Sequence, residues 1–77
     1  MTRSKNALIA IKLREARTLK GVSQDEAARA MGISQTTLSY WENHGGISLE
    51  AAINACEYYG VTLDAFTDRN NYLVATG

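Results

Sequence analysis

The sequence predicts an all-α domain, because signals that start and stop helices recur along a chain that contains no proline. Three serines stand where helix N-caps are expected, namely Ser23, Ser34 and Ser48. Three glycines stand where helices are expected to end, namely Gly21, Gly32 and Gly60. The chain has 77 residues, 45% of them hydrophobic, which suffices for one small domain with five short helices around one core.

The domain is expected to span residues 7–67, where the helical patterns lie. The polar, basic residues 1–6 precede it, either as a disordered end or as an arm that lies on DNA phosphates or in a groove. Residues 68–77 follow it and include the β-favouring run Tyr72-Leu73-Val74. This tail either is disordered, or covers the fifth helix, or pairs with a second subunit.

The first helix is expected over residues 7–20, where Ile9, Leu13 and Ala16 recur at spacings of four and three. Its later turns carry four basic residues, namely Lys12, Arg14, Arg17 and Lys20. Positive charge there suits the helix dipole, so this helix is predicted to be amphipathic and basic.

The second helix is expected to begin at a capping box. The Ser23 hydroxyl can accept from the amide of Glu26, whose carboxylate can reach back to the amide of Ser23. The helix should then run to Gly32, which can adopt the left-handed conformation at low steric cost.

The third helix is expected over about 35–42, after the Ser34 cap. Leu38 and Trp41 lie three residues apart and are expected in the core. Four side chains are left facing outward, namely Gln35, Thr36, Ser39 and Tyr40. Two short helices around a glycine-centred turn form the helix-turn-helix unit that reads DNA.

The fourth helix is expected between Ser48 and Gly60. Its apolar face is expected to contain Leu49, Ala52, Ile53, Cys56 and Tyr59. A short fifth helix is expected over about 63–67, with Phe66 in the core. Cys56, the only cysteine, permits no internal disulfide and is predicted to be a small buried residue, not a nucleophile.

The net charge is zero, but the charges are unevenly distributed. Residues 1–44 carry seven basic and four acidic side chains, a net charge of +3, whereas residues 45–77 carry one basic and four acidic, a net charge of −3. A basic half that contains the two-helix unit suits a molecule that turns one face to DNA. An ordinary solvated surface is the alternative.

Composition disfavours several classes of protein. The sequence has no apolar run near 18 residues and no signal-peptide core, so a cytoplasmic protein without membrane contact is expected. One cysteine and one histidine cannot build a zinc cluster of the usual kinds, and no metal, cofactor or small-molecule ligand is expected. The carboxylates fit helix caps and surface positions. No catalytic residue is assigned, which makes an enzyme the least favoured class.

Glycine, caps and apolar positions agree in spacing across one motif, namely Val22-Ser23-Gln24, Ala27-Ala28, Met31-Gly32-Ile33-Ser34, Leu38 and Trp41-Glu42-Asn43. This motif resembles the phage repressor and Cro class of helix-turn-helix proteins, and the likeness extends over about residues 9–66. The resemblance implies a five-helix, lambda-repressor-like DNA-binding domain with the helix-turn-helix unit at helices 2 and 3. It also implies a sequence-specific transcriptional regulator, expected to be a repressor, with double-stranded DNA as its partner.

Base contacts are expected from the third helix, which enters the major groove in this class. The expected base-contacting residues are Gln35, Thr36, Ser39 and Tyr40. The Gln35 carboxamide can make a bidentate contact with adenine N6 and N7, and the Thr36 methyl can meet thymine. Tyr40 stands where the resembled repressors commonly carry glutamine or arginine. It can stack on sugar, meet a thymine methyl or bond to phosphate.

Contacts to DNA phosphates are expected from seven residues, namely Arg3, Lys5, Arg14, Gln24, Thr37, Asn43 and His44. Gln24 begins the second helix, whose free N–H groups also attract an anion, and the resemblance implies a phosphate contact from it. A plain exposed helix residue is the alternative for Gln24, and packing is the alternative for Thr37. The resembled proteins usually carry lysine or arginine close to Asn43. Only His44 stands there in this chain, which predicts modest affinity.

The resemblance further implies a structural ion pair between Arg17 of the first helix and Glu42, which closes the third. A planar guanidinium can hold a carboxylate with two parallel hydrogen bonds and so join these helices. Glu42 is therefore expected to be structural, not catalytic.

A homodimer on a palindromic operator is expected, because two-fold symmetry places two recognition helices about one DNA turn apart. Phage repressor, restriction–modification controller and antitoxin-type autoregulator all share this architecture. The alternative function is a protein-interaction module or antitoxin-type partner whose helical unit has lost DNA binding. The zero net charge and the lack of lysine or arginine close after Asn43 favour this alternative. A steep loss of DNA affinity with added salt would count against it.

Overall fold

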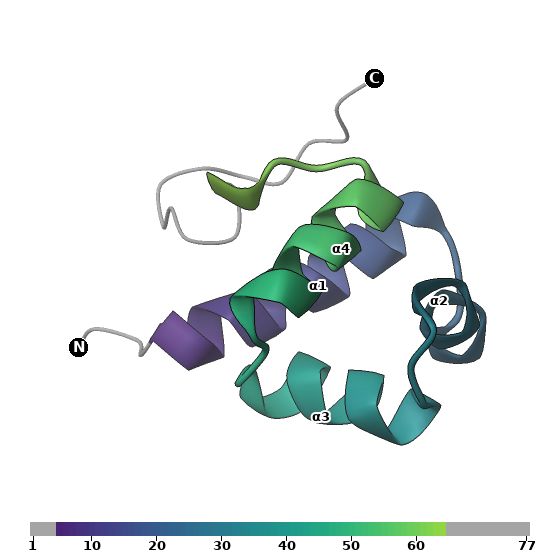
Figure 1. The fold of residues 1–77 in the computed structure, drawn as a ribbon, viewed down its shortest axis with the longest axis horizontal. Helices are drawn as coiled ribbons and strands as arrows, with labels where there is room; N and C mark the ends of the chain where they lie inside the picture. The colour runs from purple at the N-terminus through teal and green to yellow at the C-terminus, as the bar shows by residue number, and fades with distance from the viewer. Residues whose placement is uncertain (1–4, 65–77) are drawn as a thin grey trace.

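The structure, a computed structural model, describes residues 5–64 (Figure 1). Within that range the regular secondary structure is entirely helical. The helices are α1 (Lys5–Lys20), α2 (Gln24–Met31), α3 (Gln35–His44) and α4 (Leu49–Tyr59). α1 packs against α3 and α4, and α2 packs against α3 and α4 at one end of the bundle. α3 therefore has its inner face toward α1 and its outer face toward solvent.

The predicted serine caps are present at three helices. In each, the serine Oγ accepts from the backbone N–H three residues later at 3.1 Å, in the pairs Ser23–Glu26, Ser34–Thr37 and Ser48–Ala51. α2 ends at Gly32 with φ 72° and ψ 31°, a left-handed conformation that a side chain would disfavour. Local hydrogen bonds thus fix these helix ends, as the sequence predicts.

Two helices are longer than expected. α1 begins at Lys5, two residues before the predicted start, and α3 continues to His44, two residues beyond its predicted end. The longer α3 is possible because its last carbonyls have partners. The Gly45 N–H donates to Trp41 O at 2.8 Å, and Arg14 Nη2 donates to Glu42 O at 3.0 Å.

The core joins all four helices and the segment after α4. Its buried members are Leu13, Ala16, Ala27, Ala28, Met31, Leu38, Ala55, Cys56, Tyr59 and Val61. The predicted core position of Leu38 and the predicted burial of Cys56 are confirmed. Trp41 is half-buried and packs against this cluster from its rim.

A cation–π contact joins α1 to α4 outside the core. At the C-terminal end of α1, Lys20 Nζ lies 4.8 Å from the centre of the Tyr58 ring of α4.

Two residues expected on the buried face of α4 lie on the surface. Leu49 is 68% exposed and Ile53 is 44% exposed, whereas Ala55 is fully buried. The residues that the helix turns inward are Ala52, Ala55, Cys56 and Tyr59, which leaves Leu49 and Ile53 outside the buried face. The prediction that Leu49 and Ile53 belong to the buried face of α4 is therefore wrong.

Lys12, one of the four basic residues expected to make α1 a basic helix, is only 5% exposed. It lies three residues after Ile9 and four before Ala16, on the inward side of the helix. The basic character of α1 is therefore carried at its surface by other residues.

Parts of the predicted architecture lie outside the described residues. Leu63 and Asp64 are helical where the described chain ends, so the fifth helix and Phe66 remain predictions. The same is true of Arg3 in the predicted arm and of the tail 68–77. Among the described helices, none is long and apolar enough to cross a membrane.

Candidate nucleic-acid interface

Glu42 fixes the inner face of α3, although it is an acidic residue with only 2% of its surface exposed. Arg17 of α1 donates to both carboxylate oxygens, from Nε at 2.7 Å and from Nη2 at 3.1 Å. Arg17 Nη1 also donates to the Val22 carbonyl at 3.1 Å, in the loop before α2. The expected ion pair is thus present, and its hydrogen bond raises the pKa of the Arg17 guanidinium.

Gln24, the first residue of α2, also donates a hydrogen bond to the Glu42 carboxylate. Its Nε2 donates to Glu42 Oε1 at 3.1 Å, and its Oε1 accepts from Gln35 Nε2 at a long 3.5 Å. The sequence indicates a phosphate contact for Gln24 but gives no sign of these bonds, which join residues 18 and 11 positions apart. Gln24 therefore connects the buried carboxylate to the first residue of α3.

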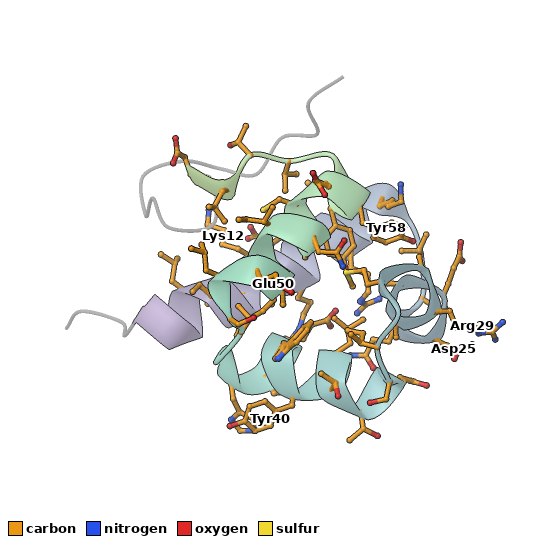
Figure 2. All side chains as sticks on the ribbon, viewed as in Figure 1. Lys12, Asp25, Arg29, Tyr40, Glu50 and Tyr58 are labelled. Atoms are coloured by element: carbon orange, nitrogen blue, oxygen red, sulfur yellow. The ribbon has the colours of Figure 1, made fainter. Side chains whose placement is uncertain are left out.

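The outer face of α3 presents polar side chains to solvent. Gln35, Thr36 and Tyr40 are exposed, and Ser39 is half-buried between them. Tyr40 is 56% exposed and points away from the other helices (Figure 2). Its ring packs on the His44 ring one turn later, with the centroids 4.8 Å apart and the planes tilted by 43°.

These side chains line one open hollow of about 470 Å³. Its lining residues are Gln24, Gln35, Thr36, Ser39, Tyr40, Asn43 and His44. The structure thus brings together the four base-contact candidates and three of the phosphate candidates. All seven are polar or aromatic, and none is a carboxylate, so this described surface contains no fixed negative charge that would repel a polyanion.

Asn43 lines the hollow near the end of α3, and both polar atoms of its side chain are hydrogen-bonded. Its Oδ1 accepts from Arg14 Nη2 at 3.1 Å, and its Nδ2 donates to the Ser39 carbonyl at 2.8 Å. Sequence reasoning places Arg14 and Asn43 among the phosphate contacts without linking them. No local pattern signals the link, because 29 positions separate the two residues.

Thr37 lies apart from the hollow. It is half-buried, its N–H donates to Ser34 Oγ, and its hydroxyl shares a 2.8 Å hydrogen bond with the same oxygen. Thr37 thus completes the cap of α3. For Lys5 only the helical backbone is described, and among the described residues no group of three His, Cys, Asp or Glu could hold a metal ion.

A family model described as helix-turn-helix matches residues 13–66 of the chain. Two solved structures are more than 25% identical to it over the aligned residues. The clp gene regulator ClgR from C. glutamicum has a TM-score of 0.76 and 27% identity, over 84% of this chain and 86% of that one. The hypothetical transcription factor NHTF from Neisseria has a TM-score of 0.78 and 29% identity, over 84% of this chain and 76% of that one.

A third solved structure, the restriction-modification controller protein C.AhdI from Aeromonas hydrophila, has a TM-score of 0.75 at 22% identity. The likeness covers 83% of this chain and 98% of C.AhdI, and at this identity it shows the fold alone. No curated protein matches the chain.

Proposed function

The chain belongs to the helix-turn-helix family of the phage repressor and Cro type, and on this basis we propose that it is a sequence-specific DNA-binding regulator of transcription. One observation carries the proposal: the exposed polar face of α3 lines a hollow without carboxylates, while Glu42 fixes the opposite face. ClgR and NHTF, which are described as a gene regulator and a hypothetical transcription factor, support it.

In the proposed complex, α3 enters the major groove with its N-terminus first. Gln35 would read adenine, and Thr36 would meet a thymine methyl or a base edge in the next pair. Ser39 and Tyr40, one turn later, would contact bases further along the groove. The hydrogen bond from Gln35 to Gln24 supports this assignment, because a side chain held before binding loses less entropy when it binds.

Phosphate contacts are proposed around this face, at its two ends. Gln24 and the N-terminus of α2 lie at one end, and Asn43 and His44 lie at the other. Arg3 and Lys5 would add contacts from the N-terminal arm, and Thr37 would add one beside the α3 cap. Few of these groups carry a full positive charge, so moderate affinity is expected.

The finer proposal is a repressor that binds a palindromic operator as a homodimer. A single helix of ten residues reads few base pairs, so a second copy on a symmetric site would supply the missing specificity. Two recognition helices would then lie about 34 Å apart on one side of the DNA. Repression would follow from occupation of the operator.

Selection of bound duplexes from a random pool tests this proposal. The native protein, Gln35→Ala and Glu57→Ala would be compared at one salt concentration. Glu57 is exposed on α4, outside the hollow, and its variant is the matched control. A palindrome enriched by the native protein and the control, but changed at one position per half-site by Gln35→Ala, is expected. A folded native protein that enriches no sequence would refute the proposal.

A protein-interaction module is the second candidate function, favoured by one surface of α4. Leu49 and Ile53 are exposed there, one turn apart, and the acidic Glu50 and Glu57 flank them. An apolar pair beside negative charge suits contact with another protein. DNA affinity that falls steeply with added salt would disfavour this candidate, since counterion release requires phosphate contacts.

A further inference from the structure

We infer that Arg14 positions the end of the recognition helix and thereby sets the base-reading surface, instead of binding a DNA phosphate. The inference rests on the proposed function, because only a DNA-reading α3 gives this position a consequence for specificity. Arg14 is exposed on α1, where a phosphate contact would be the simplest expectation for an arginine near DNA.

One of the two terminal nitrogens of the Arg14 guanidinium, Nη2, is hydrogen-bonded within the protein. Nη2 donates to Glu42 O at 3.0 Å and to Asn43 Oδ1 at 3.1 Å. A guanidinium Nη group carries two N–H donors, and these two acceptors account for both. Its positive charge also lies at the C-terminus of α3, where the helix dipole is negative.

The two contacts act on different parts of α3. Glu42 O is one of the last carbonyls of the helix, which have no partner within it, so the bond to Arg14 stabilises the final turn. Asn43 is oriented through its side chain, and its Nδ2 then donates to Ser39 O at 2.8 Å and lies 3.4 Å from Ser39 Oγ. A connected path thus leads from α1 to a proposed base-reading residue.

Arg14 and Arg17 hold the same residue of α3 by different atoms. Arg17, one turn later on α1, binds the Glu42 carboxylate, and Arg14 binds the Glu42 carbonyl. The first contact anchors the inner face of α3, and the second fixes how the helix ends. The direction of the last turn, which carries Asn43 and His44 into the hollow, therefore depends on Arg14.

The test compares Arg14→Ala with Arg29→Ala in binding to the selected duplex over a range of salt. Arg29 is a matched control, because it is an exposed arginine that pairs with Asp25 on the outer side of α2 (Figure 2). Arg14→Ala should weaken specific binding about tenfold, the size expected for lost hydrogen bonds to a charged group. Its slope of log K against log salt should equal that of the native protein.

Two further readouts accompany the salt series. Selection with Arg14→Ala should show relaxed preference at the base pairs contacted through Ser39. Asn43→Ala should also weaken binding, and the loss in the double variant should be smaller than the sum of the two single losses, because part of the effect of each residue passes through the same path. A shallower slope, by about 0.9 for one lost phosphate contact, with equal losses on specific and non-specific DNA, would overturn the inference.

A measurement on the free protein decides the positioning role without DNA. The Gly45 N–H donates to Trp41 O in the last turn of α3, and its hydrogen exchange reports how often that turn opens. Exchange at Gly45 should be about tenfold faster in Arg14→Ala, with exchange in α2 unchanged. Unchanged exchange at Gly45 would overturn the positioning role. A native protein that selects no DNA sequence would refute the proposed function, while this exchange would still decide the role of Arg14.

Discussion

Gln24 donates to Glu42 across the α2–α3 interface, with 3.1 Å between Nε2 and Oε1. The same carboxylate accepts two hydrogen bonds from Arg17 of α1, so three helices meet at one buried acidic group. A buried carboxylate is costly unless it is paired and hydrogen-bonded, and here both of its oxygens have donors. This arrangement fixes the helix-turn-helix unit on α1.

Loss of Arg17 is expected to destabilise the domain. In Arg17→Ala the Glu42 side chain, 1% exposed, would keep only Gln24 as a side-chain donor among the described residues. The free energy of unfolding should fall by about 3 kcal/mol, the range seen when one member of a buried ion pair is removed. Urea denaturation followed by circular dichroism measures this loss. A loss below about 1 kcal/mol, typical of surface ion pairs, would contradict the prediction.

Replacement of Tyr59 by phenylalanine is expected to stabilise the protein. Tyr59 is 4% exposed, and its buried hydroxyl has no hydrogen-bond partner in the part of the chain that the structure describes. Tyr59→Phe removes this desolvated group and keeps the ring, so stability should rise by about 1 kcal/mol. The melting temperature should rise by about 5 °C. A lower melting temperature would show that the hydroxyl is satisfied.

Stability is expected to fall at alkaline pH. Burial raises the pKa of Tyr59 above the ordinary 10.0, an effect that the Glu42 charge reinforces, and burial raises the pKa of Cys56 above 9.0. As pH rises, these groups lose protons first in the unfolded chain, which favours unfolding. Their contribution is therefore fully present below about pH 9 and is lost progressively above it.

Urea denaturation between pH 7 and pH 11, roughly the span in which thiols and phenols titrate, measures this decline. Tyr59→Phe should make the decline above pH 10 shallower. Tyr40→Phe, at an exposed ring, is the matched control and should leave the native profile unchanged. Equal declines in the native protein and Tyr59→Phe would contradict the assigned cause.

Substitution of Gly32 tests the turn between α2 and α3. Its φ of 72° is the only obstacle to a side chain, because an added Cβ would meet no atom within 4 Å. Gly32→Ala should therefore cost about 1 kcal/mol through backbone strain alone. Gly32→Asn should cost less, because asparagine tolerates the left-handed region. Equal stability of all three proteins in urea would show that the turn relaxes without strain.

Much of the fold could be predicted because its signals are local. The Ser34 cap and the Gly32 stop act through bonds within a few residues, so the sequence shows them directly. The position of a helix on the core is not local. The spacing of α4 allows Leu49 and Ile53 to face inward, but the helix lies with Ala55 inward and with both of these residues exposed.

The candidate site also has a part that could be predicted from local sequence and a part that could not. Gln35 and Tyr40 could be assigned from their places on a helix that resembles known recognition helices, and the structure puts both in the hollow. The link from Arg14 to Asn43 depends on how α1 lies against α3, which no pattern within either helix specifies. Residues that hold the site in place are therefore harder to find from sequence than residues that face the partner.

The two-sided construction of α3 also bears on how such a regulator can change its target. Leu38 and Glu42 anchor the helix from within, while Thr36 and Tyr40 face solvent with little part in the core. Substitutions on the solvent side can therefore accumulate at small cost to folding, so a new DNA-sequence preference would be accessible to mutation without compensating changes elsewhere.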